Sequence, residues 1–287
     1  MLMGQLDIAP PIMAGFKLHT ESLRLGAATD FGAQGFTHDE TGMVLSLCSM
    51  IEGSVQALGT AFLVLPGLAM SAAHVVADYQ EAGRLEAGPL LLIGAFGEDL
   101  RAWAVDRIRM PKEGDVALLE IVPRFDQGEG VHINHVHLSA RLPKVGEPVL
   151  ALGLIASAPD FPFDPAADDA LIAVTGVAAT GTVLEFYPRR DRNLPGPTLR
   201  CNFMAPGGMS GGPVFDKDGY VCGIVSASME IDGAWESYVS LHWPAIMFET
   251  HPSWPEKLYQ AATLWPGHVH ENWHLGINVD EIAYFED

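Results

Sequence analysis

The chain has 287 residues, of which 48% are hydrophobic and 18% charged. This composition supports a sizeable buried core and excludes a globally disordered chain. The 36 acidic residues outnumber the 16 basic ones, giving a formal net charge of −20, and such a surface repels phosphate backbones and argues against a nucleic-acid partner.

The beginning of the chain predicts neither a secretory signal nor a membrane span. The first residues lack a basic region, and Asp7 and Pro10 interrupt any apolar stretch. Residues 53–77 contain no Asp, Glu, Lys or Arg, a length that could span a membrane. Gly59 and Pro66 within it are more typical of a strand, a turn and a second strand. We therefore expect a soluble, cytoplasmic protein.

The cysteines indicate a reducing compartment. There are three, Cys48, Cys201 and Cys222, an odd and sparse set that excludes a disulfide framework. Even if Cys201 and Cys222 approach each other on neighbouring strands, a cytoplasmic chain keeps them reduced. None lies in a glycine-flanked turn, so a cysteine nucleophile is not predicted.

Strand-like segments begin only after a long N-terminal stretch. Residues 1–41 show no clear period and are predicted to be an extension that lies on the rest of the protein. Short apolar runs rich in Val, Ile, Leu, Phe and Thr follow, separated by turn residues, and 30 glycines and 20 prolines agree with many turns. This pattern predicts an all-β protein, a β-sandwich or β-barrels. The runs cover 44–51, 55–65, 68–76, 89–97, 100–110, 116–122, 148–156, 171–187, 198–204, 212–216 and 220–228.

Two segments depart from the strand pattern. Residues 157–169 are rich in Pro and Asp and are predicted not to form a strand. The C-terminal segment from about residue 244 contains Trp254, Trp265 and Trp273, and so many indoles in a polar tail suggest that it docks on the body.

The sequence from Ala205 to Val214, APGGMSGGPV, has the composition of a nucleophile turn. A reactive hydroxyl needs a sharp turn that exposes it and backbone N–H groups that hold a developing oxyanion. Ser210 fits the first need, and Gly208 can turn its N–H inward because it has no Cβ. An ordinary glycine-rich turn is the alternative.

A serine requires a base, and the base requires an orienting group. His74 is the best base, because it lies where an apolar strand ends and an alanine-rich stretch, which could start a helix, begins. Asp115 heads the very apolar strand VALLEIV, where a buried carboxylate needs a partner. Asp106 and Asp78 are rivals that lead no such run.

These motifs together resemble trypsin- and chymotrypsin-like serine peptidases. The resemblance rests on SAAH at His74, GDVALL at Asp115 and GMSGGP at Ser210, in that order, and on GTAFLV and GIVS elsewhere, and it covers roughly 43–250. It implies two packed antiparallel β-barrels, residues 42–128 and 129–250, with an N-terminal extension (1–41) and a partly helical C-terminal tail (251–287). It further implies that Ser210 is the nucleophile, His74 the general acid and base, and Asp115 its orienter. The oxyanion hole would be the amides of Gly208 and Ser210.

Departures from the digestive enzymes of the family favour its bacterial intracellular or HtrA-like members. Met209 stands where those enzymes have an Asp that pairs with a new N-terminus after zymogen cleavage, so that activation route is not available. Their disulfides are absent as well, and no PDZ module is visible after residue 250.

The resemblance also indicates substrate-binding residues. Met204, six residues before the serine, would be the floor of the primary pocket, with Ser228 on a wall and Ser226 in the segment that lines the cleft and backs Asp115. These residues favour a small or medium apolar side chain at the cleaved residue. Glu230 and Asp232 in a neighbouring loop could reverse this preference.

Two histidine clusters allow, but do not predict, a metal site. They are His132, His135 and His137, and His268, His270 and His274, and neither guarantees three convergent ligands. The sequence therefore predicts a cofactor-free serine endopeptidase that acts on polypeptides and is switched by a regulatory protein partner. The alternative is a catalytically silent module that binds proteins through the same fold.

Overall fold

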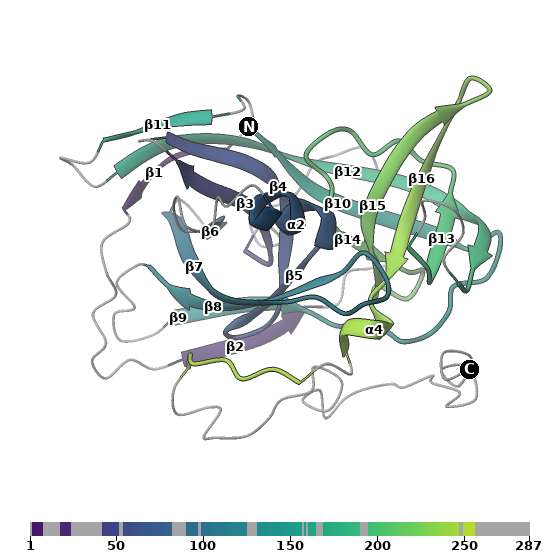
Figure 1. Cartoon of the computed structure of the whole chain (residues 1–287), viewed down its shortest axis with the longest axis horizontal. Coiled ribbons are helices and arrows are strands. Elements are labelled where there is room, and N and C mark those ends of the chain that lie inside the picture. The colour runs from purple at the N-terminus through teal and green to yellow at the C-terminus, as the bar shows by residue number, and fades with distance from the viewer. Residues whose placement is uncertain are drawn as a thin grey trace.

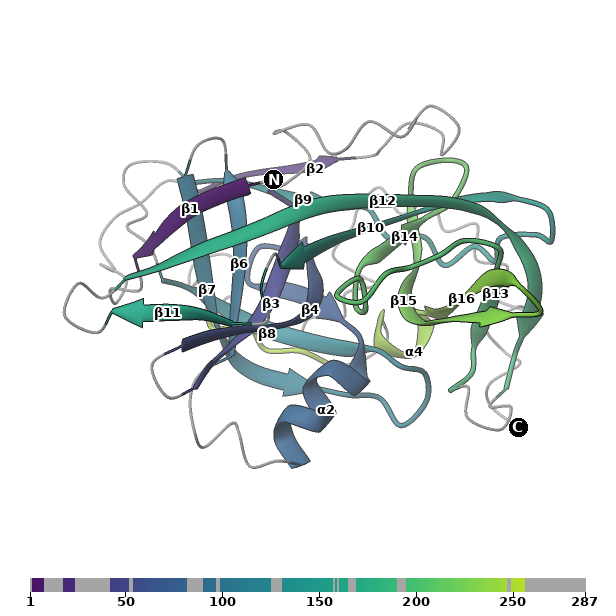
Figure 2. The ribbon, with the colours of Figure 1, turned by 90° about the horizontal axis from the view of Figure 1, so that it is seen from above.

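The structure is a computed structural model of the whole chain, and strands account for most of the residues that it describes (Figures 1 and 2). Within the described residues no helix is long and apolar enough to cross a membrane. The described residues are 2–7, 18–23, 42–51, 54–81, 90–96, 99–124, 131–156, 158, 160–164, 169–189, 195–246 and 249–255.

Six antiparallel strands close the first barrel, to the left in Figure 1. Around the ring each strand is hydrogen-bonded to the next in the order β4, β3, β6, β7, β8, β5 and back to β4. The uncharged stretch 53–77 forms β4, a turn, β5 and the start of a helix, as the sequence predicts. The strands are β3 (Val44–Ile51), β4 (Ser54–Leu65), β5 (Leu68–Ser71), β6 (Leu90–Phe96), β7 (Asp99–Arg109) and β8 (Ala117–Pro123).

A second ring of six antiparallel strands forms the other barrel, which confirms the expected two-barrel, all-β fold. Its order is β10, β14, β15, β16, β13, β12 and back to β10. The β15–β16 hairpin projects from this barrel at the upper right of Figure 1. The strands are β10 (Pro148–Ala156), β12 (Asp169–Tyr187), β13 (Thr198–Cys201), β14 (Pro213–Phe215), β15 (Val221–Ile231) and β16 (Ala234–Leu241).

The remaining strands attach to the barrels or connect them. β1 (Leu2–Asp7) pairs antiparallel with β12, and β2 (Leu18–Leu23) pairs in parallel with β9 (Val131–Val136). These two strands are the described parts of the N-terminal extension, and they do lie against later strands. The helices are α2 (Ala73–Glu81) and α4 (Trp243–Ile246). Whether the C-terminal tail is partly helical falls outside the described residues, which end at 255.

The prediction that residues 157–169 contain no strand is wrong. β11 (Asp160–Asp164) lies in this segment, pairing with β4 through residues 160–162 and with β12 through 163–164. Pro162 cannot donate a ladder hydrogen bond, but a short strand that changes partner along its length loses little by this. β11 thus joins a strand of the first barrel to a strand of the second.

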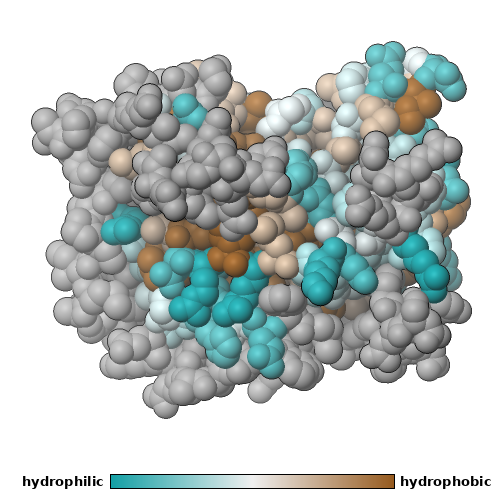
Figure 3. Space-filling model, viewed as in Figure 1, coloured by the Kyte–Doolittle hydropathy of each residue, from teal (hydrophilic) through white to brown (hydrophobic). Residues whose placement is uncertain are grey.

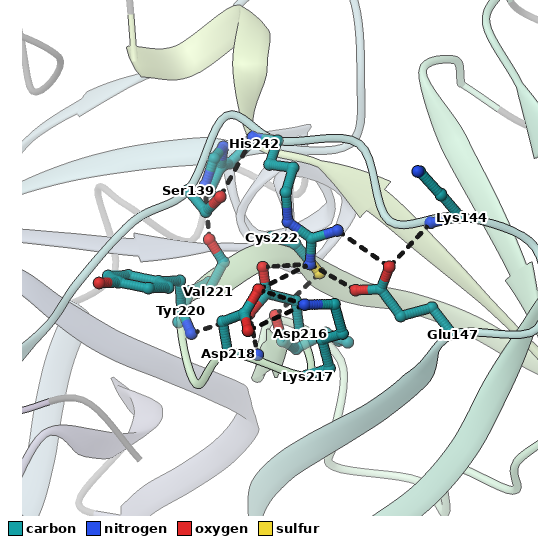
Figure 4. A network of polar contacts seen from close by, with 12 residues as sticks. Ser139, Lys144, Glu147, Asp216, Lys217, Asp218, Tyr220, Val221, Cys222 and His242 are labelled. Atoms are coloured by element: carbon teal, nitrogen blue, oxygen red, sulfur yellow. Dashed lines mark hydrogen bonds and ion pairs between the residues drawn. The ribbon is translucent and has the colours of Figure 1, made fainter. Parts of the chain in front are cut away.

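An arginine holds the connection between the barrels to the second barrel through Glu147 and Asp216, which are labelled in Figure 4. Arg141 lies in this connection and forms ion pairs with Glu147 and with the fully buried Asp216, at 2.8 Å from Nη2 to Oδ2 for the latter. The other Asp216 oxygen accepts the backbone N–H groups of Asp218 and Tyr220 in the β14–β15 turn. The buried carboxylate is therefore compensated on both oxygens, which is the condition for tolerating charge in a core.

The C-terminal segment 249–255 returns to the first barrel, as its tryptophan suggested (yellow, Figure 1). The His251 N–H donates to Glu120 Oε1 at 2.9 Å, and Glu120 is fully buried on β8 beside Arg109. Trp254 is only 1% exposed, and its carbonyl lies against Gly67 in the β4–β5 turn. The described part of the tail is thus packed against the first barrel. Trp265 and Trp273 lie outside the described residues.

Gly67 should be intolerant of a side chain. It has φ +80°, and a Cβ there would collide with the Trp254 carbonyl oxygen. We expect Gly67→Ala to lose about 2–4 kcal/mol of unfolding free energy, from left-handed backbone strain and displacement of the tail. Gly146→Ala is the matched control, because Gly146 has φ +85° and its Cβ would meet nothing within 4 Å. Urea unfolding measures both, and equal losses would show that the tail does not pack on this turn.

Two buried histidines are held neutral. Burial lowers the pKa of His135 on β9 to about 4 and that of His242 to about 4, against an ordinary 6.5. His242 Nε2 lies 2.9 Å from the Val221 carbonyl, so Nε2 carries the hydrogen (Figure 4). Its Nδ1 finds no hydrogen-bond partner within the described part of the chain. Between about pH 4 and pH 6.5 these two histidines are therefore protonated in the unfolded chain and neutral in the folded protein.

Stability should consequently fall with pH below 6.5. The pKa of each histidine is lower in the folded protein than in the unfolded chain, so neither histidine reduces the unfolding free energy above pH 6.5. Between pH 7 and pH 5 each of them reduces the unfolding free energy by about 2 kcal/mol. His242→Gln keeps a donor for the Val221 carbonyl but removes the titration, so its unfolding free energy should fall by about 2 kcal/mol less than that of the wild type over this range. A wild-type slope in His242→Gln would contradict the assignment.

Candidate active site

His74 lies in the first turn of α2, where β5 has just ended. Val75 and Val76 pack into the core and fix the start of the helix, and the His74 side chain is 43% exposed. The sequence expectation of a histidine at the junction of a strand and a helix is met. An imidazole in this position is anchored by its backbone and still reachable from solvent.

Asp115 faces His74 from the start of β8. Its Oδ2 lies 2.7 Å from His74 Nδ1, and its Oδ1 accepts the backbone N–H of His74 at 2.8 Å. The carboxylate is 6% exposed and follows Gly114, whose φ of +76° turns the chain there. Of the rival carboxylates, Asp106 is exposed on β7, and the side chain of Asp78 lies outside the described residues. Asp115 is the carboxylate that the structure brings to His74.

The second barrel contributes two serines that contact Asp115, one at its carboxylate and one at its backbone N–H. Ser226 Oγ donates to Asp115 Oδ2 at 2.5 Å, and the Asp115 N–H donates to Ser240 Oγ at 2.9 Å. Ser226 lies where the pairing of β15 with β16 shifts register, and such a bulge re-aims a side chain. The sequence reasoning anticipated that the Ser226 segment backs Asp115. It missed Ser240, whose only signal is a serine at a buried position of an apolar strand.

These contacts keep Asp115 ionised. Burial raises the pKa of its carboxyl, but the hydrogen bonds and charge of His74 and the hydroxyl of Ser226 together lower it further. The net pKa lies below the ordinary 3.8. At neutral pH the pair is a carboxylate facing an imidazole nitrogen, which must carry its hydrogen on Nδ1.

Ser210 lies in the turn between β13 and β14, packed against the first barrel. Its carbonyl accepts the Thr60 N–H from β4 at 2.8 Å. The next residue, Gly211, has φ +89°, and a Cβ there would collide with Thr60 O and Ser71 Oγ. Ser71 ends β5, three residues before His74. The turn with Ser210 and the strand end with His74 are therefore in direct contact at the junction of the two barrels.

The backbone amides of this turn fall into two groups. The N–H groups of Met209, Gly211 and Gly212 donate to carbonyls at 2.8–3.2 Å. Those of Gly208 and Ser210 make no hydrogen bond within the described ranges. Gly208 has φ +96°, a conformation that side chains disfavour. Two donors in one turn are thus left for a ligand, and they are the two that the sequence indicated.

The three residues assigned to substrate binding have different surroundings. Met204 is 46% exposed. Ser228 Oγ accepts the Ala205 N–H at 3.1 Å and donates to the Glu236 carbonyl, so it ties the segment beside Met204 to the β15–β16 hairpin. Ser226 instead faces Asp115. Ser228 is therefore bonded to the residue next to Met204, whereas the Ser226 hydroxyl is bonded to Asp115.

The hairpin near Met204 also carries apolar side chains into solvent. Met229 and Trp235 are 42% and 44% exposed, and Figure 3 shows apolar atoms among hydrophilic ones at the end of this hairpin. Glu230 and Asp232, named as possible modifiers of specificity, lie on the same hairpin. Asp232 is at its tip, with φ 51°.

In the described residues, neither the histidine clusters nor the cysteines form a metal site. No group of three metal-ligating side chains occurs there. His135 is buried, and the His137 ring packs edge-on against Tyr220. His268, His270 and His274 lie outside the described residues. All three cysteines are free and buried, and burial raises the pKa of Cys48 to about 11 and that of Cys201 to about 12.

Solved structures similar to this one include two proteases. The protease domain of MamO from Magnetospirillum magneticum has 15% identity and a TM-score of 0.50, covering 71% of this chain and 93% of that one. An inactive form of the Rv3671c protease has 21% identity and a TM-score of 0.45, covering 71% and 85%. Another similar structure, that of Deg5, has 16% identity and a TM-score of 0.48, covering 69% and 83%. At 15% identity the likeness to the MamO domain concerns the fold alone.

A comparison with curated protein sequences finds no match. The sequence model of the trypsin-like peptidase domain, in contrast, matches residues 59–224, a span that runs from β4 through β15 and contains His74, Asp115 and Ser210. This is more than half of the chain. The protein therefore belongs to the family of trypsin-like peptidase domains.

Proposed function

We propose that this protein is a serine endopeptidase in which Ser210 is the nucleophile, His74 the general acid and base, and Asp115 the orienting carboxylate. The observation that carries the proposal is the doubly hydrogen-bonded pair of His74 and Asp115, at 2.7 and 2.8 Å. A bond from the backbone N–H in addition to the one from the ring fixes the carboxylate relative to the helix start. Only one tautomer of His74 satisfies this arrangement, with hydrogen on Nδ1 and the basic lone pair on Nε2.

In the proposed reaction, Ser210 Oγ attacks the carbonyl carbon of a peptide bond while its proton passes to His74 Nε2. The resulting imidazolium is stabilised by the ionised Asp115. His74 then returns the proton to the leaving amine, and the C–N bond breaks to leave an acyl group on Ser210. A water molecule, deprotonated by His74, hydrolyses this ester and restores the serine. The pKa of Asp115, below its ordinary value, keeps the proton on histidine throughout.

The amides of Gly208 and Ser210 would hold the oxyanion of the tetrahedral intermediates. Support comes from their lack of acceptors in the described residues, whereas the neighbouring amides are already bonded. Preorganised donors of this kind stabilise charge that develops only in the transition state, and removing one typically costs about 10²–10³ in kcat.

For specificity we propose that Met204 and Ser228 line the primary pocket and favour a small or medium apolar side chain. The exposure of Met204 supports this, because removing its apolar surface from water against a substrate side chain would favour binding. Ser228 acts by holding the backbone beside Met204. Ser226 would serve the substrate segment through its backbone, since its hydroxyl is engaged by Asp115.

We further propose a cytoplasmic setting and a specific protein partner that switches activity. Three free, buried thiols suit a reducing compartment. Residues 1–41 and 251–287 lie outside the two barrels (42–128 and 129–250) and are the segments proposed for regulation. The exposed Met229 and Trp235 on the β15–β16 hairpin offer apolar contacts beside the proposed specificity pocket.

A fluorophosphonate probe tests the catalytic assignment. We expect the wild type to be labelled on Ser210, and Ser210→Ala to give no label and about a 10⁶-fold lower kcat. His74→Ala should be about as severe, and the double variant little worse, because the groups act as a unit. Ser139→Ala is the control, because the Ser139 hydroxyl is engaged by the Arg141 N–H in the connection between the barrels, and it should be labelled like the wild type. A folded wild type that the probe does not label would instead indicate a catalytically silent binding module.

A further inference from the structure

Two backbone hydrogen bonds lie within the turn that contains Gly208 and Ser210, from Met209 N–H to the Pro206 carbonyl and from Gly212 N–H to the Met209 carbonyl. Four glycines flank Met209 and Ser210, at 207, 208, 211 and 212. A Cβ at Gly207 would meet nothing within 4 Å, so no neighbouring atoms confine the chain there. Glycines have more backbone freedom than other residues, so a single conformation of this turn requires contacts from outside it. Met209 supplies no charge for an ion pair.

Thr60 in β4 makes two of these contacts from the first barrel. Its Oγ1 donates to the Gly208 carbonyl at 2.7 Å, and its backbone N–H donates to the Ser210 carbonyl at 2.8 Å. The side chain is fully buried. One residue therefore holds the Gly208 and Ser210 carbonyls, which fixes the peptide planes on either side of the 209–210 peptide that carries the Ser210 N–H, and fixes the plane next to the one that carries the Gly208 N–H.

The direction of the Thr60 hydroxyl hydrogen follows from its surroundings. A hydroxyl has one hydrogen to donate and lone pairs to accept. Oγ1 accepts the Leu154 N–H from β10 at 3.1 Å, and its own hydrogen has two carbonyls in range, Gly208 at 2.7 Å and Leu154 at 3.4 Å. The shorter contact takes the hydrogen. The hydroxyl thus joins β10, β4 and the turn in one hydrogen-bonded chain.

Met209 adds an apolar anchor between the two pinned carbonyls. It is fully buried and packs on Gly153 of β10, where a Cβ would lie 2.7 Å from Met209 Cγ and 3.1 Å from its Cα. The described part of the C-terminal tail, by comparison, packs at Gly67 and Glu120 of the first barrel. In the described residues, the contacts that reach the turn from outside it therefore come from the barrels and not from the described part of the tail.

We propose that Thr60 is a positioning residue that keeps the oxyanion turn in its catalytic shape in place of an ion pair. The proposal rests on the proposed peptidase function, since it concerns the amides of Gly208 and Ser210. Without the hydroxyl, the Gly208 carbonyl is released, and the peptide planes beside it can rotate about glycine torsions. The nucleophile, His74 and Asp115 would remain, but the oxyanion donors would be held in register only part of the time.

Thr60→Val removes the hydroxyl at nearly constant shape, and Thr60→Ser restores it. We expect Thr60→Val to react with the fluorophosphonate about 10–100-fold more slowly than the wild type, with kcat lowered and KM changed less than about threefold. Thr60→Ser should stay within about threefold of the wild type. Hydrogen exchange of the Gly211 and Gly212 amides should become faster in Thr60→Val and not in Thr60→Ser.

Thr198→Val is the matched control, because Thr198 is also buried and its Oγ1 donates to a backbone carbonyl, that of Pro195, in the second barrel. It should lower the melting temperature without slowing labelling. If Thr60→Val does not fold, Thr60→Ala replaces it in every comparison. The smaller side chain leaves space for a water molecule that can accept the Leu154 N–H.

Three outcomes decide the proposal. Slower labelling and faster turn exchange in the hydroxyl-free variant alone support it. Labelling or turn exchange no different from that of Thr198→Val overturns it. A wild type that is not labelled refutes the peptidase function, and hydrogen exchange then decides by itself whether Thr60 orders the turn.

Discussion

The arrangement of the site depends on one buried carboxylate that two barrels share. Asp115 is nearly inaccessible to solvent, and a charge in such a place is tolerated only when hydrogen bonds replace its hydration. His74 of the first barrel provides two, and Ser226 of the second provides a third. Ser240 of the second barrel accepts the Asp115 N–H. Neither barrel alone provides all the hydrogen bonds that Asp115 makes. The ionised form of Asp115 therefore depends on how the two barrels are placed relative to each other.

The serine turn is held by the same principle of contacts across the junction. Ser210 belongs to the second barrel, but its carbonyl is bonded to Thr60 of the first. Gly211 has no Cβ, which allows the turn to approach Thr60 and Ser71 closely. The strand end that precedes His74 and the turn around Ser210 are therefore fitted together by backbone atoms.

Much of the fold was predictable because its signals are local. The strands around the two barrels, except β16, coincide with apolar runs bounded by turn residues, and His74, Asp115 and Ser210 were indicated by short motifs at the ends of such runs. β11 was not predicted, because its pairing with β4 involves residues far away in the sequence and overrides the bias of Pro162. Ser240 and Thr60 were missed for a related reason. Each looks like an ordinary strand residue until the barrels bring its partner, Asp115 or Gly208, to it.

The most direct test of this account is to replace the shared carboxylate by its amide. In Asp115→Asn the backbone N–H of His74 requires an acceptor at the Oδ1 position, so the amide nitrogen must face His74 Nδ1 and select the wrong tautomer. The account predicts that kcat/KM falls about 10⁴-fold while the protein stays folded. Asp106→Asn, at an exposed position of β7, should leave kcat/KM unchanged. A loss of less than about tenfold in Asp115→Asn, or an equal loss in Asp106→Asn, would contradict the role given to Asp115.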